Sequence, residues 1–482
     1  MDLTEVEGRN IEQKDSMGTP LAWAAKNGRE EVVWELLGRD DIDPDRPGAD
    51  GETPLMRAAR NGHEGVVKML LGRDDVDPNK PNEDGEVPLM SAAWNGHEGV
   101  VEMLLGRSDI NPDQPDEDGQ TPLLLATNNG HEGVVKILLG RDDVNPNKLN
   151  EDGLTPLMWA VWNRHREVVK VLLGRDDVDP NLQDHEGRTP LSWAAEQGYG
   201  ALAKLLLGRD DVNPNIPDDD GNTPLLWAIE NEHEALVKLL LGKGGINPDK
   251  PNKLGKTPLF LAAYIGHEGI VEMLLERDDV NPNTPDSDRE TALYRSARHG
   301  NDRIVEMLLG RDDIDPNTSN GDGQTALYRA AWCGWWEIVE MLLRKDDLDP
   351  NKPDNDDQTP LLLAVYEGRE RVVKMLLGRS DVNPNKPDKD GETPLLWAAR
   401  NGREAMVKLL LERGDVSTNQ PSKDGQTPFL QAARNGHERV VKMLLGRNDI
   451  DPNKPDSQGR TPLWWATENG HAGVIALLQP PA

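Results

Sequence analysis

The sequence predicts an all-α solenoid, because one unit recurs along nearly all of its 482 residues. A threonine returns every 34 residues from Thr19 to Thr461, and Val87 fills the single missing slot. No insertion or deletion interrupts this spacing, and a fixed period of about 20 to 50 residues is the signature of a repeat architecture. Such an array has no single core, because each repeat buries its apolar face on its neighbours.

We therefore expect one continuous solenoid over residues 19–482, preceded by an N-terminal cap or partial loop over residues 1–18. Fourteen repeats begin near residues 19, 53, 87, 121, 155, 189, 223, 257, 291, 325, 359, 393, 427 and 461.

Each repeat is expected to begin with a short helix. In the second copy, Thr53 is a suitable N-cap, Pro54 suits the first helical position, and Gly62 ends the helix. Leu55 and Ala58 share one face, at a spacing of three. The paired alanines that recur at this place allow close approach between helices.

A second helix and a polar loop complete the repeat. Residues 64–71 place Val66, Val67 and Leu70 on one amphipathic stripe. Residues 72–85 are polar, and their two prolines and Asp-Gly pair predict an extended stretch and a tight turn. Each repeat is thus helix, turn, helix and a projecting loop or hairpin.

These features resemble the ankyrin repeat, in which an Asp-Gly turn precedes Thr-Pro-Leu-His, two alanines, Gly-His and a Val-Val-Leu-Leu helix. The resemblance covers about residues 10–479 and implies the ankyrin fold. The period of 34 is one more than the usual ~33, and the His after Thr-Pro-Leu is replaced, for example by Met56 and Tyr294. We therefore expect the hairpin to be anchored differently. The loop at 140–147 is similar in style to fungal ankyrin arrays, some of which are sensor regions of immune-like proteins.

The composition argues against nucleic acids and membranes as partners. Formal net charge is -32, from 86 acidic and 54 basic residues, so the surface repels phosphate. Cys333 is the sole cysteine, which excludes an internal disulfide and agrees with a reducing compartment. Residues 1–10 have no apolar signal core, and no apolar run is long enough to span a bilayer. We expect a cytoplasmic or nuclear location.

The histidines form a ladder that we interpret as structural. One histidine per repeat supplies single residues, whereas zinc needs about four convergent ligands. A calcium loop is also not indicated, because its twelfth position counted from Gln114 is Leu125 rather than a bidentate Glu. We expect no metal and no cofactor. Eight of the ten histidines share the register just after the first helix: His63, His97, His131, His165, His233, His267, His437 and His471.

A second ladder is basic in all thirteen complete loops, from Arg39 to Arg447. The residue two places later is Asp in twelve of them, Gly245 being the exception. Exposed pairs of this kind contribute about 0–1 kcal/mol each, which indicates a scaffold role. No Ser-His-Asp constellation, phosphate loop or acid/base pair tied to a pocket is present, so we expect no enzymatic activity.

Candidate functional residues lie where the repeats differ. The fourth and seventh positions after each threonine share the face opposite the alanines, and in the ankyrin family this face lines the concave groove. These 28 positions hold nine of the 13 tryptophans, and eight bases against three acids. Trp, Tyr and Arg are enriched in binding hot spots. We predict these partner-binding residues: Trp23, Arg57, Arg60, Trp94, Trp159, Trp162, Trp193, Glu196, Trp227, Glu230, Tyr264, Arg295, Arg298, Arg329, Trp332, Tyr366, Trp397, Arg400, Arg434 and Trp465.

Packing between neighbouring helices is the alternative interpretation of the fourth position, which Leu125 and Leu261 also occupy. We favour a binding surface, because a fully buried position would rarely accept Arg57 or Ser91. Repeats five to seven combine tryptophans with glutamates and suit an apolar or cationic segment. The arginine-rich repeats nine, ten, twelve and thirteen suit an acidic or polar one. Two pairs are spaced to stack: Arg329 with Trp332, and Trp397 with Arg400.

The function that the sequence favours is a non-enzymatic scaffold that binds a protein or peptide along the groove. One alternative is a reader of cationic groups such as methyl-lysine, with a tryptophan cage beside Glu196 and Glu230. Another is a structural spacer within a larger sensor protein. The identity of the partner and the oligomeric state do not follow from the sequence.

Overall fold

The computed structural model describes residues 18–48 and 50–479, which fold into paired helices. The one pairing of extended segments found in this described part is an isolated bridge between Ser319 and Thr325. The all-α ankyrin solenoid predicted from the sequence is confirmed. The chain divides into two compact halves, residues 1–247 and 248–482. Of the predicted cap 1–18, all but Gly18 lies outside the described residues.

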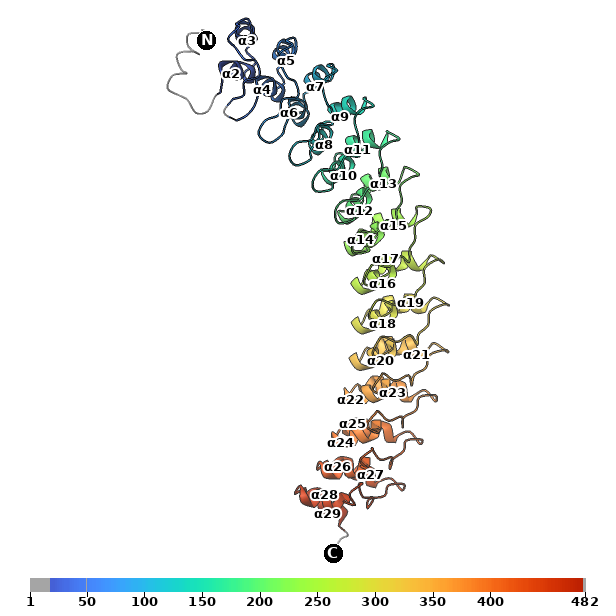
Figure 1. Ribbon diagram of the computed structural model, residues 1–482. Helices are drawn as coiled ribbons and strands as arrows, with labels where there is room; N and C mark the ends of the chain where they lie inside the picture. Colours follow the sequence, from blue (N-terminus) through green and yellow to red (C-terminus); the bar gives the residue numbers. More distant parts are fainter. Residues whose placement is uncertain (1–17, 49, 480–482) are drawn as a thin grey trace. The chain divides into compact units, whose positions relative to one another are not determined.

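In each half the even-numbered first helices form one layer and the odd-numbered second helices form another (Figure 1). The first helices of the N-terminal half are α2 (Pro20–Lys26), α4 (Pro54–Arg60), α6 (Pro88–Asn95), α8 (Pro122–Asn128), α10 (Pro156–Trp162), α12 (Pro190–Glu196) and α14 (Pro224–Glu230). Its second helices are α3 (Glu30–Leu37), α5 (Glu64–Leu71), α7 (Glu98–Leu105), α9 (Glu132–Leu139), α11 (Arg166–Leu173), α13 (Gly200–Leu206) and α15 (Glu234–Leu241).

The C-terminal half has the same organisation. Its first helices are α16 (Pro258–Ile265), α18 (Ala292–His299), α20 (Ala326–Cys333), α22 (Pro360–Tyr366), α24 (Pro394–Arg400), α26 (Pro428–Arg434) and α28 (Pro462–Glu468). Its second helices are α17 (Glu268–Leu275), α19 (Asp302–Leu309), α21 (Trp336–Leu343), α23 (Glu370–Leu377), α25 (Glu404–Leu411), α27 (Glu438–Leu445) and α29 (Ala472–Leu478).

The repeated threonine caps each first helix, as the sequence predicts. Its Oγ1 accepts the backbone N–H three residues later; Thr53, for example, accepts from Met56 at 3.1 Å. This bond satisfies one of the orphan donors at a helix start. The side chain of Val87 has no oxygen, and the N–H of Met90 donates instead to the backbone carbonyl of Val87 at 2.9 Å.

The core of each half lies between the two layers and between successive first helices. Ala58 and Ala59 of α4 are fully buried, as are Val66, Val67 and Leu70 of α5. The small alanines let the first helices of neighbouring repeats pack directly, α4 against α6 and α12 against α14 among them. Close packing of this kind leaves no room for a larger side chain on the alanine face.

The histidine ladder is structural, as predicted. His131 Nε2 lies 2.8 Å from the carbonyl oxygen of Trp94, the seventh-position residue of the preceding repeat. Six further histidines make the equivalent contact, at 2.9–3.1 Å: His63, His97, His165, His233, His437 and His471. Each ring therefore satisfies a helix-end carbonyl of its neighbour. Among the described residues no group of three or more His, Cys, Asp or Glu side chains could hold a metal ion.

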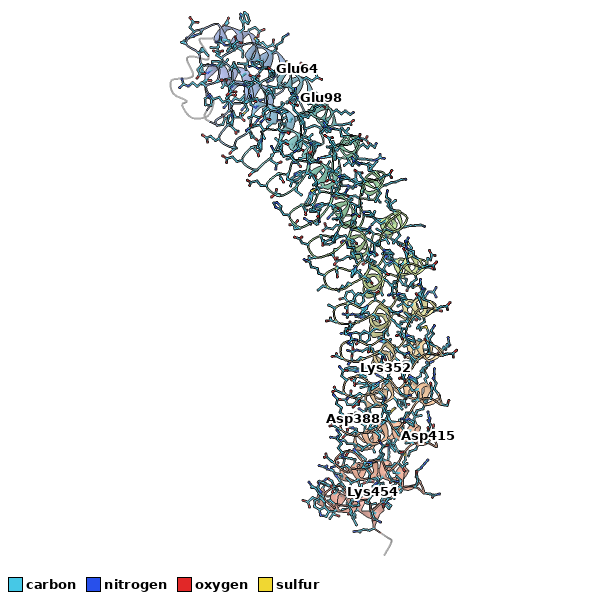
Figure 2. The ribbon with its side chains drawn as sticks, turned by 45° about the vertical axis from the view of Figure 1, so that its right-hand side comes forward. Glu64, Glu98, Lys352, Asp388, Asp415 and Lys454 are labelled. Atoms are coloured by element: carbon cyan, nitrogen blue, oxygen red, sulfur yellow. The ribbon has the colours of Figure 1, made fainter. Side chains whose placement is uncertain are left out.

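The basic ladder also joins neighbours, which confirms its scaffold role. Arg107 binds Asp109 in its own loop and donates through Nη1 to the carbonyl of Leu71, in the preceding repeat, at 3.1 Å. Lysines of the loops act similarly: Lys352 Nζ donates to the carbonyl of Asn317 at 2.6 Å, and Lys454 Nζ to that of Asn419 at 3.2 Å (Figure 2). These bonds hold each loop at a fixed place on the loop before it.

Candidate functional site

The two predicted rows of variable side chains differ sharply in exposure. Counting from the threonine, the seventh position is the outer one. Its aromatic residues Trp94, Trp162, Tyr264, Trp332 and Tyr366 have exposed fractions of 36–47%. Its basic residues Arg60, Arg298 and Arg400 have side chains that are 42–47% exposed. We call these seventh-position residues the outer row.

The fourth position is largely buried, so the argument that a buried position would reject polar residues is wrong here. Arg57, Ser91 and Trp193 are all buried. Trp465 and Gln431 are buried as well, whereas Trp23, Trp159, Trp227, Arg295, Arg329 and Trp397 are half-buried. We call these fourth-position residues the inner row. The packing interpretation therefore holds for much of the inner row.

Arg57 tolerates burial because acids of its own repeat surround its guanidinium. Nη2 lies 2.5 Å from Asp50 Oδ1, and Nε lies 3.6 Å from Glu52 Oε2. A buried charge is stable only when it is paired and hydrogen-bonded. Both acids stand in the turn just before the first helix, a segment that the sequence analysis left out of the candidate site.

That pre-helix turn, the five residues before each threonine, begins with an Asp or Asn in most repeats. In the sixth repeat Asp184 Oδ1 accepts the backbone N–H groups of Glu186 and Arg188, at 3.0 and 2.8 Å. Asn150 closes its own turn in the same way, accepting from the N–H of Leu154 at 2.8 Å. The turn thus aims the second carboxylate oxygen of an Asp at the first helix.

Three inner-row tryptophans, Trp193, Trp227 and Trp465, anchor their turns, which is one way in which the hairpin is held without the usual histidine. Trp193 Nε1 donates to Asp184 Oδ2 at 3.0 Å, and Trp227 Nε1 donates to Asp218 Oδ2 at 2.8 Å. A tyrosine of the tenth repeat also anchors a turn. The Tyr328 hydroxyl donates to Asp354 Oδ2, in the turn of the next repeat, at 2.6 Å. Burial and the nearby Asp354 carboxylate raise the pKa of Tyr328 well above its usual range, so its proton stays in place.

The predicted tryptophan cage of repeats five to seven already contains a cation of the chain. The rings of Trp162 and Trp193 lie 4.3 Å apart, and the guanidinium carbon of Arg188 lies 3.5 Å from the centre of the Trp193 ring. Arg188 is also 3.8 Å from Glu196. Glu230 is exposed. Binding of a methylated lysine at this place stays a prediction, and Arg188 would compete with it.

Acids of the pre-helix turns pair most of the predicted basic residues. Glu290 binds Arg295 and lies 3.6 Å from Arg298 Nη1, and Glu392 lies 2.5 Å from Arg400 Nη1. Burial raises the pKa of both glutamates, whereas the arginines lower it. The arginines therefore present less net positive charge to a partner than the sequence count indicates.

One of the two predicted stacks is present. Arg329 lies over the ring of Trp332, 4.7 Å from its centre. Arg400 instead pairs with Glu392, and the ring of Trp397 lies 4.1 Å from that of Tyr366. Arg434 covers the ring of Trp465 at 4.0 Å.

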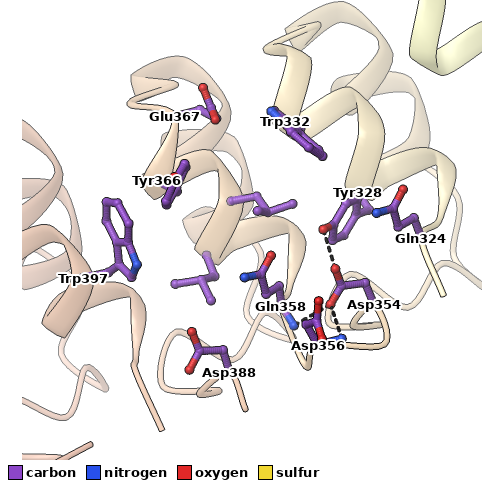
Figure 3. Close-up of a pocket in the computed structure, with 12 residues that line it drawn as sticks. Gln324, Tyr328, Trp332, Asp354, Asp356, Gln358, Tyr366, Glu367, Asp388 and Trp397 are labelled. Carbon is purple, nitrogen blue, oxygen red and sulfur yellow. Dashed lines mark hydrogen bonds between the residues drawn. The ribbon is translucent and has the colours of Figure 1, made fainter. Parts of the chain in front are cut away.

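Several pockets open beside the outer row, and two of them combine its aromatic residues with acids. One, of about 330 Å³, lies along α20, α22 and α24 and is shown in Figure 3. Its aromatic wall consists of Tyr328, Trp332, Tyr366 and Trp397, and its acids are Asp354, Asp356, Glu367 and Asp388. No lysine or arginine is among the described residues that line it. The other, of about 650 Å³, lies in the N-terminal half and includes Trp94, Trp159 and Asp116.

A comparison with protein families identifies the array. A model of three consecutive ankyrin repeats matches residues 3–82, 21–116, 89–184, 176–252, 244–320, 312–388, 349–420, 372–456 and 415–481. The chain belongs to the ankyrin-repeat family. Ankyrin repeats are generally protein–protein interaction modules, and ankyrin-repeat proteins are typically non-enzymatic scaffolds. A comparison with curated proteins gave no match. None of the helices in the described part has the length and apolar character needed to cross a bilayer.

Proposed function

We propose that this ankyrin-repeat chain is a non-enzymatic scaffold, acting in the cytoplasm or nucleus, that binds a protein or peptide along its outer row. The observation that carries this proposal is the contrast between the rows. Aromatic side chains of the outer row stay 36–47% exposed, whereas much of the inner row is buried, and Trp193 and Trp227 of that row donate their indole N–H groups to carboxylates. Exposed aromatic groups held by a rigid support are the usual anchors of protein interfaces.

The support beneath the outer row is rigid for identifiable reasons. Each outer-row residue is the last or next-to-last residue of a first helix, and its carbonyl is in several repeats held by the histidine of the next repeat, as with Trp94 and His131. Its helix begins at a threonine cap, or at Val87 in the case of α6, and packs on alanines. A partner would therefore lose little free energy to ordering of the scaffold on binding.

Affinity capture from a cell extract, with an outer-row variant beside a matched control, tests the proposal. The variant carries Trp332→Ser and Tyr366→Ser. The control carries Trp34→Ser and Trp335→Ser, which remove side chains that are 72% and 41% exposed on or beside second helices. Hot-spot truncations commonly cost at least ~2 kcal/mol each, so the outer-row variant should bind at least about thirtyfold more weakly.

Circular dichroism and thermal melting show whether both variants keep the fold. The proposal requires partners that the parent and the control retain and that the outer-row variant loses. Equal retention by both folded variants would refute the outer row as the binding surface.

A further inference from the structure

The pocket along α20, α22 and α24 combines aromatic faces with carboxylates, which is the chemistry that binds a cation. Two side chains define its mouth: Tyr366, 46% exposed at the end of α22, and Trp397 of α24, whose rings lie 4.1 Å apart. Asp388, in the turn before α24, lies below them (Figure 3). Carboxylates attract a cation directly, and an indole face attracts it through the ring quadrupole.

The same chain shows which cation this combination holds. In the sixth repeat the guanidinium of Arg188 lies 3.5 Å from the Trp193 ring centre, and its Nε lies 3.2 Å from Asp184 Oδ2. In the fourteenth repeat Arg460 lies 4.2 Å from the Trp465 ring centre, and its Nε lies 2.9 Å from Asp456 Oδ2. In both repeats the indole N–H donates to the same carboxylate, which completes a triad of Asp, Arg and Trp.

The twelfth repeat keeps the Asp and the Trp of this triad but lacks its Arg. Glu392 stands where Arg188 and Arg460 stand in their repeats, one residue before the threonine. Glu392 turns away to pair with Arg400 at 2.5 Å. The twelfth repeat therefore has the carboxylate and the indole of the triad, but it has Glu392 at the position where the sixth and fourteenth repeats have an arginine.

The geometry of Trp397 and Asp388 differs accordingly. Asp388 Oδ1 closes its turn by accepting the N–H groups of Asp390 and Glu392, each at 2.9 Å. Among the described residues, neither a bond from the Trp397 indole N–H to Asp388 nor any other partner for Asp388 Oδ2 is present. The Trp397 ring lies against Tyr366 instead, beside a cavity of about 330 Å³. An acceptor oxygen and two ring faces thus border open space.

We propose that this pocket binds an arginine side chain of the partner, whose guanidinium supplies the positive charge that Arg188 and Arg460 supply within their own repeats. This inference rests on the proposed scaffold function and adds the chemistry of one contact. The guanidinium donates to Asp388 Oδ2 and lies against the rings of Trp397 and Tyr366. Asp354, on the opposite side of the pocket, adds to the attraction, whereas Asp356 pairs with Lys389 at 3.1 Å. A planar guanidinium fits an indole face and a carboxylate at once better than an ammonium does.

Titration of capped arginine amide into the full chain, labelled with 5-fluorotryptophan, tests the proposal by fluorine NMR. The Trp397→Phe variant assigns the Trp397 resonance. We expect that resonance to shift saturably with the arginine amide, to shift more weakly with capped lysine amide, and to stay in place with capped norleucine amide. Preference for capped trimethyl-lysine amide over arginine amide would overturn the assignment to a guanidinium.

Two variants connect the shift to the pocket. Asp388→Asn removes the charge and keeps the turn, because Asn150 and Asn320 close equivalent turns through the same oxygen. Glu392→Arg restores the internal cation and should fill the site. Each should weaken arginine binding at least about tenfold, as expected for loss of a charge-assisted hydrogen bond. The matched controls are Asp286→Asn, in a turn outside the pocket, and Glu412→Arg on the exposed end of α25, and both should bind as the parent does.

The outcomes separate this inference from the proposed function. Unchanged affinity in Asp388→Asn, or a shift that does not saturate, overturns the arginine site, and the scaffold function still stands on the capture experiment. If arginine amide binds saturably but the outer-row variant captures the same partners as the parent, the proposed function is refuted and the arginine site still stands.

Discussion

The third repeat begins at Val87 instead of a threonine, so exchanging valine and threonine between repeats two and three tests how much the threonine cap contributes to stability. Helices α4 and α6 begin with the same three residues, Pro-Leu-Met. In α4 the buried N–H of Met56 donates to Thr53 Oγ1 at 3.1 Å. In α6 the corresponding N–H of Met90 donates to the carbonyl of Val87. Thr53→Val and Val87→Thr exchange these two arrangements with almost no change in volume.

The expected change in stability is set by two opposing terms. Loss of an N-cap hydroxyl costs about 0.5–2 kcal/mol. The valine methyl that replaces it recovers up to about 0.8 kcal/mol, because both positions are fully buried. Thr53→Val should therefore destabilise the array by at most about 2 kcal/mol, and by less where the new methyl packs well. Val87→Thr should stabilise it, by no more than that, because the N–H of Met90 already has an acceptor.

Urea denaturation shows whether each substitution stabilises or destabilises the array, and hydrogen exchange shows which helix start is affected. Unfolding of a long repeat array need not be two-state, so exchange of the Met56 and Met90 amides is the more direct measurement. We expect the Met90 amide to exchange more slowly in Val87→Thr and the Met56 amide to exchange faster in Thr53→Val. A lower urea midpoint in Val87→Thr would show that Val87 fits an apolar niche and that the cap argument fails there.

Two further predictions concern the packing and the loops. Ala194→Asp places an unpaired charge on the buried face of α12, between α10 and α14, and should lower the stability of the fold by about 3–5 kcal/mol. Amide hydrogen exchange should become faster in those three helices and stay unchanged in α2. An equal increase in α2 would contradict nearest-neighbour stability. The Arg107 guanidinium lowers the pKa of Asp109 below its usual 3.8, so the pair stabilises the fold above that pH and ceases to do so as the pH falls through the lowered value. The urea midpoint of the parent should therefore exceed that of Asp109→Asn at pH ~6, and the difference should shrink as the pH falls below 3.8; a constant difference would contradict this assignment.

The fold was predictable because its causes are local and repeated. The threonine at the start of each first helix and the two small residues on its face lie within ten residues of one another, and they recur at a constant spacing. The histidine and arginine ladders were predictable as ladders for the same reason. Their acceptors, such as the Trp94 carbonyl for His131, could not be identified, because they are backbone atoms of another repeat.

The candidate site was only partly predictable. Position in the repeat identified the outer row, but within the inner row it could not separate Trp159, which is half-buried, from Trp193, which is buried. That difference depends on the pre-helix turn, whose Asp184 binds the Trp193 indole. The signal was available, because an Asp or Asn stands five residues before the threonine in most repeats. The orientation of Trp397 toward Tyr366 was not available, because it depends on side chains of two repeats together.

Photo-cross-linking from single positions tests most directly whether the outer row is the binding surface. A photoreactive phenylalanine analogue placed at Trp332 or Tyr366 reports on the outer row. The same group at Trp34 or Trp335 reports on the surface formed by the second helices. Irradiation in cell extract and mass spectrometry of the products should give one partner that is shared by the two outer-row positions and is missing from the other two. The account is contradicted if the partner held by the parent chain cross-links from the second-helix positions and from neither outer-row position.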